Sequence, residues 1–161
     1  MDYWDSLGWT YRFPSAKNSD RQRSVSNAAR AGVYTPGFFL NGIEWRGLFS
    51  AKALPTAKFE PVPINISARL LERTLEISAV TSDNMFVAVS ESSLANQVKA
   101  GENRNRLLKH DRVVRVWQPL NAKSQITLPA DLNLAKAKLV VWHEINGKAS
   151  GAAQVDLLSC K

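Results

Sequence analysis

The sequence predicts an α+β protein that is rich in β-structure. Three observations lead to this class: a polar, helix-forming segment that begins near residue 19, an Asn-Gly pair between two apolar runs, and short runs after residue 64 in which apolar and polar residues alternate. We expect a helix and a hairpin over residues 1–50, a linker over 51–63, and an antiparallel β-sandwich-like region over 64–161. The whole chain can also pack as one domain.

The helix is expected over residues 19–31. Ser19 is a suitable N-cap, and Gln22 stands three residues later, which completes a capping box. Arg30 suits the negative end of the helix dipole, and Gly32 suits the left-handed position after a helix. One narrow apolar face is expected to be buried, formed by Val25, Ala28 and Ala29.

A β-hairpin is expected after the helix. Asn41-Gly42 separates two apolar runs, and both residues accept the positive φ angles of a type I′ turn. We therefore predict antiparallel strands over 38–41 and 42–46. Pro36 stands before the first strand, where its missing N–H removes one donor from the ladder.

The linker is placed where prolines gather, at Pro55, Pro61 and Pro63, with a short helical turn near 49–54. After it the pattern is that of short strands separated by turns, including a second Asn-Gly hairpin at Asn146-Gly147. The strands are expected over 64–70, 75–79, 86–89, 97–100, 113–117, 126–128, 139–142 and 152–158.

The charge of the chain favours acidic partners. The 161 residues carry a net charge of +7, from 21 Lys and Arg against 14 Asp and Glu. The densest basic stretch is 104–112, in which apolar and acidic residues interrupt the cations. A binder of nucleic acid or of an anionic cell-envelope polymer is therefore one alternative, with nucleic acid the less favoured partner. No apolar run is long enough to predict a membrane span.

Cys160 is the single cysteine, so the chain can form neither an internal disulfide nor a multi-cysteine zinc site. A free thiol is expected, with pairing between chains as the alternative. We predict no catalytic residue, no metal site and no cofactor.

Several motifs in order along the chain resemble one bacterial family, the secreted thioredoxin-like domain of unknown function twelve twenty-three. The resemblance covers nearly the whole chain, and its motifs are Asp2-Tyr3-Trp4-Asp5, Leu7-Gly8-Trp9, Arg21-Gln22, Val33-Tyr34-Thr35-Pro36, Asn41-Gly42, Gly101-Glu102-Asn103 with Leu107 and Val113-Val114-Arg115, and Gly151-Ala152-Ala153.

This resemblance implies a thioredoxin-like helix and a hairpin entered through a cis-proline at Thr35-Pro36, in a periplasmic or secreted protein. Members carry a Cys-containing segment upstream of the Asp-Tyr-Trp-Asp motif, whereas this chain begins at that motif. The resemblance therefore implies a truncated protein without the redox cysteine pair.

The leading hypothesis is a non-catalytic module that binds a peptide or protein. The resemblance places the ligand at Tyr34, Thr35 and Pro36. Tyr3 and Trp4 are further candidates, although packing under the helix and hairpin is the role that the sequence favours for them. The alternative is a thiol-disulfide oxidoreductase whose catalytic segment is absent from this chain. We also expect a homodimer through the 38–46 hairpin, because an uncovered strand edge invites pairing.

Overall fold

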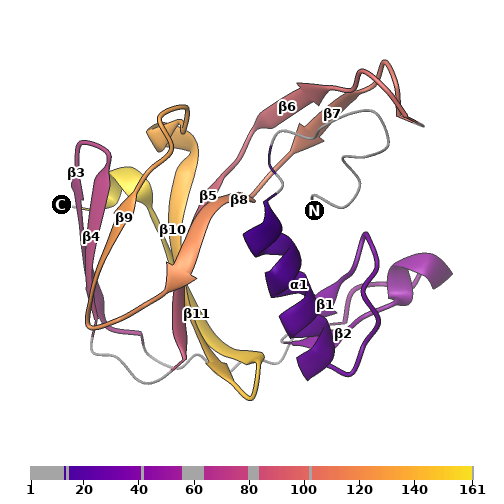
Figure 1. Cartoon of the computed structure of the whole chain (residues 1–161), viewed down its shortest axis with the longest axis horizontal. Coiled ribbons are helices and arrows are strands. Elements are labelled where there is room, and N and C mark those ends of the chain that lie inside the picture. The colour runs from indigo at the N-terminus through magenta and orange to yellow at the C-terminus, as the bar shows by residue number, and fades with distance from the viewer. Residues whose placement is uncertain are drawn as a thin grey trace.

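The computed structural model describes residue 13 and residues 15–40, 42–55, 64–79, 84–101 and 103–160. One helix, α1 (Ala16–Ala28), and a two-stranded hairpin, β1 (Phe39–Leu40) with β2 (Ile43–Glu44), lie beside a set of antiparallel sheets (Figure 1). The expected β-rich α+β class is confirmed. The boundary at 51–63 stays a prediction, because much of that segment lies outside the described residues.

Helix α1 begins three residues before the predicted start. Its N-cap is Ser15, whose hydroxyl oxygen accepts a hydrogen bond from the Asn18 amide at 3.3 Å. Ser19 lies inside the helix and is buried, so the predicted capping box does not form. The predicted apolar face is partly right: Val25 and Ala29 are half-buried, whereas Ala28 is exposed and Ser26 is buried in its place. The earlier start places the first turn of α1 against the sheet.

The C-terminal end of α1 is a Schellman motif centred on Arg30 rather than on Gly32. Arg30 has a left-handed φ of +53°. Its amide donates to the Asn27 carbonyl at 3.0 Å, and the Ala31 amide donates to the Ser26 carbonyl at 2.8 Å. A residue with a Cβ therefore occupies the position that glycine usually takes.

The predicted Asn-Gly hairpin is confirmed, with shorter strands than expected. Phe39 pairs with Glu44 and Leu40 with Ile43, and the Trp45 amide extends the ladder to the Phe38 carbonyl at 2.8 Å. The Thr35–Pro36 peptide bond before the hairpin is cis. A 3₁₀ turn, η2 (Gly47–Ser50), follows close to the predicted helical turn.

The β region contains two main antiparallel sheets. Strand order is β11-β10-β5-β8 in the larger sheet and β3-β4-β9 in the smaller one. The larger sheet ends in the second predicted Asn-Gly hairpin, whose turn residues have φ of +52° and +74°. The strands are β3 (Ile66–Leu71), β4 (Thr74–Ala79), β5 (Met85–Glu91), β8 (Val113–Pro119), β9 (Lys123–Thr127), β10 (Ala137–Ile145) and β11 (Lys148–Asp156), with 3₁₀ turns η3 (Leu134–Lys136) and η4 (Leu157–Ser159).

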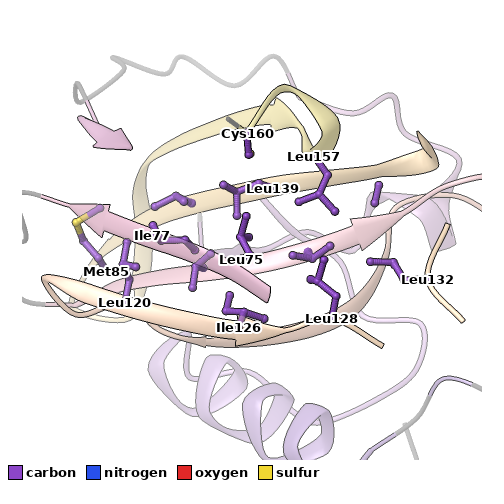
Figure 2. Packing of buried hydrophobic residues seen from close by; sticks show 14 residues of the cluster. Leu75, Ile77, Met85, Leu120, Ile126, Leu128, Leu132, Leu139, Leu157 and Cys160 are labelled. Carbon is purple, nitrogen blue, oxygen red and sulfur yellow. The ribbon is translucent and has the colours of Figure 1, made fainter. Parts of the chain in front are cut away.

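The hydrophobic core fills the space between these two sheets (Figure 2). Leu75 and Ile77 on β4 and Ile126 on β9 face Leu139 and Val141 on β10. All five side chains are almost fully buried, and each buried aliphatic side chain contributes roughly 1.5–3 kcal/mol to folding. The β-sandwich is therefore the stable body on which the rest of the chain is built.

A further hairpin extends the β5–β8 pair, at one edge of the larger sheet, away from the body (Figure 1). It consists of β6 (Leu94–Gln97) and β7 (Leu107–His110), which continue β5 and β8. The predicted strand at 97–100 is thus wrong in position, and β7 was not predicted. We call residues 94–112 the arm.

The end of α1, the β1–β2 turn and the β10–β11 turn meet at one end of the larger sheet. A Cβ on Gly147 would lie 2.6 Å from Ala28 Cβ, at the end of α1. A Cβ on Gly42, in the β1–β2 turn, would lie 2.6 Å from Lys148 Cα. The β10–β11 turn is therefore held between the end of the helix and the tip of the hairpin.

The left-handed Arg30 gives a stability prediction. Arg30→Gly should raise the free energy of unfolding by about 0.5–1 kcal/mol, because it removes the steric strain of the Cβ at this φ. The greater flexibility of glycine in the unfolded chain offsets part of the gain, and the figure allows for this. Urea unfolding of the purified chain measures the change. Arg30→Ala is the matched control, since it removes the charge and keeps the Cβ; equal stabilisation by both variants would contradict the conformational explanation.

Candidate functional site

The outer face of the larger sheet, opposite the core, carries two rows of side chains that the strand register defines. The first row is aromatic: Trp142 pairs with Phe86, and their rings stack with centroids 5.4 Å apart and an interplanar angle of 18°. The second row is smaller at its centre: Val140 pairs with Ala88 and with Gln154, and Ala88 pairs with Trp117. Large side chains therefore project from the sheet along the first row, whereas the small side chain of Ala88 leaves a depression in the second.

Helix α1 is attached to the aromatic row through Arg21. The Arg21 guanidinium forms an ion pair with the Glu144 carboxylate, in which the Glu144 side chain is 8% exposed. The same carboxylate accepts a hydrogen bond from the Trp142 indole N–H at 2.8 Å. Arg21 also lies over the Phe86 ring, 4.9 Å from its centroid. One cation thus joins the helix to two strands.

The first turn of α1 is fixed to Trp117 on β8. The Trp117 indole N–H donates to the Asn18 side-chain oxygen at 2.9 Å. Lys17 Nζ donates to the Trp117 carbonyl at 2.7 Å and lies 4.7 Å from the centroid of its ring. These contacts hold the start of the helix at one edge of the sheet and explain why the helix begins at Ala16.

Between the helix, the loop at 35–37 and the low second row lies a cavity of about 850 Å³. This is within the range of small-ligand and side-chain pockets. Ala88 and Val140 lie on its sheet side, and Val25, Pro36 and Phe39 lie on the opposite side. The remaining described lining residues are Phe13, Asn18, Arg21, Gln22, Thr35, Gly37, Ser90, Arg112, Val113, Val114, Trp117, Trp142 and Gln154.

The cavity is apolar with a few polar groups and no acidic side chain among its described lining residues. Arg112 and Gln154 lie at one side of it, where Arg112 Nη1 donates to the Gln154 side-chain oxygen at 2.7 Å. Both side chains are exposed. Such a site suits an apolar group that enters from solvent, with polar or anionic atoms left near the rim.

The structure brings two of the predicted site residues, Thr35 and Pro36, to the wall of this cavity. Tyr34 does not line it. Its carbonyl accepts a hydrogen bond from Gln22 Nε2 at 2.8 Å, which ties the loop to α1. Tyr3 and Trp4 lie outside the described residues. Their ligand-binding role stays a prediction, as it does for the other three.

Tyr34 belongs to a neighbouring polar cluster on the hairpin. Glu44 and Arg46 form an ion pair with Nε–Oε2 at 3.0 Å, and the Arg46 guanidinium lies 5.1 Å from the Tyr34 ring centroid. Burial and the Glu44 carboxylate raise the pKa of Tyr34, while hydrogen bonds from Arg46 and Tyr34 lower the pKa of Glu44. The cluster therefore keeps a neutral phenol and an ionised carboxylate over the ordinary pH range, and it fixes the loop that carries Thr35.

The sequence did not single out the floor of the cavity. Ala88 and Val140 are ordinary strand residues, and only the pairing of β5 with β10 makes them neighbours. Arg112 and Gln154 are 42 positions apart and meet at the rim. The feature that marks the floor is the small side chain of Ala88 beside the bulky Phe86 and Trp117 on the same face of the sheet. This feature can be recognised only once the pairing of the strands is known.

Other reactive side chains lie away from the cavity. Cys160 is 7% exposed and packs in the core, where burial raises the pKa of its thiol. His143 Nδ1 and Ser150 Oγ lie 2.7 Å apart across β10 and β11, and neither residue lines the cavity. In the described part of the chain, no group of three or more His, Cys, Asp or Glu could hold a metal ion. None of its helices is long and apolar enough to cross a membrane.

Comparisons with known proteins agree with the predicted family. The family profile described as "Protein of unknown function (DUF1223)" matches residues 1–144. No curated protein matches the chain. The X-ray crystal structure of protein AGR_C_4864 from Agrobacterium tumefaciens is similar at 20% sequence identity and a TM-score of 0.55, over 98% of this chain and 78% of that one. At this identity the similarity concerns the fold alone.

The buried thiol gives a reactivity prediction. In the folded protein Cys160 should react with a thiol reagent such as Ellman's reagent roughly a hundredfold or more slowly than in urea, because both access and thiolate formation are suppressed. The time course of thionitrobenzoate release measures both rates. Free N-acetylcysteine is the control, and a native rate close to that control would contradict a structural role for the thiol.

Proposed function

We propose that this chain, which belongs to the DUF1223 family of proteins of unknown function, is a module that binds a peptide or protein and catalyses no thiol exchange. The observation that carries the proposal is the apolar cavity bounded by the Thr35–Pro36 loop, α1 and the outer face of the larger sheet. The ligand would place an apolar side chain over Ala88 and its backbone beside Thr35.

The contacts around the cavity favour a preformed site. Lys17 and Asn18 attach the first turn of α1 to Trp117 on β8, and Arg21 attaches the helix to Glu144 on β10. Gln22 binds the Tyr34 carbonyl and so holds the loop before Thr35 to the helix. A site whose walls are already fixed loses less conformational entropy on binding. The absence of a second cysteine from the sequence, and the burial of Cys160, support the non-catalytic part of the proposal.

The finer fold assignment is part of the same proposal. The order of helix, Thr35–Pro36 loop and tight hairpin supports a thioredoxin-like unit at the N-terminal side of the β-sandwich. The resemblance that predicted this unit also predicts a periplasmic or secreted location, and we propose that the protein works there.

Filling the cavity tests the binding function. The probe is reduced, carboxymethylated α-lactalbumin, which presents unfolded polypeptide to the immobilised chain. Wild type should bind it saturably, and Ala88→Phe should weaken binding by roughly tenfold or more because the new ring occupies the floor. Gln154→Trp, which obstructs the exposed rim and leaves the floor intact, should act in the same direction.

The matched control is Ala122→Phe, which adds the same ring at an exposed position that does not line the cavity. It should bind as wild type does. Equal binding by all the variants, or no binding by the wild type, would refute the cavity as the site. Insulin reduction by this chain that Cys160→Ala abolished would refute the non-catalytic assignment.

We further propose that two copies of the chain associate through the β1–β2 hairpin. No third strand pairs with this hairpin in the described part of the chain, and Ile43 on β2 is 62% exposed. Ile43→Lys should therefore shift the protein toward monomer in concentration-dependent light scattering. Leu54→Lys removes an exposed leucine elsewhere and should leave association unchanged. A wild type that stays monomeric while its hairpin amides resist hydrogen exchange would rule the dimer out.

A further inference from the structure

The arm concentrates positive charge beside the cavity. Its described residues include five cations and one acidic residue, Asp111; a second acidic residue of the arm, Glu102, lies outside the described residues. The cations are Lys99, Arg104, Arg106, Lys109 and Arg112. All five cationic side chains are exposed. The arm extends away from the sandwich, so its cations can reach a partner that the body of the protein does not touch (Figure 1).

Four of these cations take no part in ion pairs within the described part of the chain. Within the described residues, Lys99, Arg104, Arg106 and Lys109 form no ion pair, whereas Arg21 and Arg115 both do. Charges that only repel one another across a narrow ribbon oppose folding slightly. Their arrangement is therefore better explained by an external anionic partner than by stability.

The arm and the cavity are continuous through Arg112. This residue ends the arm, lines the cavity, and is followed by Val113 and Val114, which line the cavity as well. A ligand chain that leaves the cavity past Arg112 reaches the arm directly.

The bend between arm and sheet is fixed by side chains. The Ser93 amide donates to the Asp111 carboxylate at 2.8 Å, and the Arg112 amide donates to Ser92 Oγ at 3.1 Å. Ser93 and Arg112 both have left-handed φ, near +59° and +55°. Asp111 is thus used at the bend, and the arm is presented in one direction relative to the cavity.

We propose that the ligand of the cavity is an acidic protein segment: its apolar side chain enters the cavity, and the carboxylates that follow lie along the arm. The inference rests on the proposed function and adds the chemical class of the partner. It follows from a cavity whose described lining residues include no acidic side chain, and which opens beside cations that form no ion pair within the described part of the chain; acidic chains are complementary to both.

Three synthetic peptides test this inference on the full chain. All share the same apolar anchor, and their tails alternate serine with glutamate, glutamine or lysine. The glutamate peptide should bind roughly tenfold more tightly than the glutamine peptide, and the lysine peptide should bind most weakly. The preference for glutamate should shrink between roughly 50 and 200 mM salt, because exposed charges are screened.

Charge reversal locates the effect. Arg106→Glu with Lys109→Glu should abolish the preference for the glutamate tail and leave binding of the glutamine peptide unchanged. Arg69→Glu with Lys123→Glu changes the net charge equally at exposed positions on the smaller sheet, and should keep the preference.

The outcomes separate the two proposals. If no peptide binds, the proposed function fails and this inference fails with it. If all three bind equally, or if the arm variant keeps the preference, the acidic partner is wrong while the binding function stands. Duplex DNA that binds through the arm more tightly than the glutamate peptide would overturn the inference in favour of a nucleic-acid partner.

Discussion

The arrangement of the chain depends on the contact of Arg21 with Glu144 and the aromatic row. Apart from alanine, Val25 is the one apolar residue of α1, so hydrophobic burial contributes little to its attachment. Ordering a backbone residue costs roughly 1–2 kcal/mol, and the helix must recover this through other contacts. Loss of one partner from a buried ion pair generally costs about 3–5 kcal/mol. The Arg21 side chain is 23% exposed, so this pair should contribute less than that; together with the contacts of Lys17 and Asn18 with Trp117, it gives the helix, and with it one wall of the cavity, a fixed position.

The cavity results from the same polar attachment. Long polar side chains hold α1 at the aromatic row and at Trp117, while the floor beyond them is formed by the short side chains of Ala88 and Val140. An apolar helix face would have packed down onto that floor and filled it. The hollow is thus the geometrical result of a helix attached through its first turn and through one arginine.

Features set by local chemistry could be predicted from the sequence, whereas those set by tertiary contacts could not. The two Asn-Gly turns follow from residues that accept positive φ, and both hairpins are present. The predicted start of α1 is three residues too late because Ser19, with Gln22 three residues on, has the stronger local capping pattern. The contacts of Asn18 and Lys17 with Trp117 favour the start after Ser15 instead. Strand β7 escaped prediction because two adjacent leucines followed by Lys109 and His110 show no alternation.

The turns that meet at Gly147 constrain how this protein can vary. Ala28 and Gly147 are far apart in sequence, yet a methyl group added to Gly147 would collide with Ala28. A methyl group added to Gly42 would collide with Lys148 in the same way. A larger residue at any of these positions would force the helix end, the sandwich turn and the hairpin tip apart together. The sizes of residues 28, 42 and 147 should consequently be inherited as a set, with a change at one tolerated only in lineages where a neighbour has already made room.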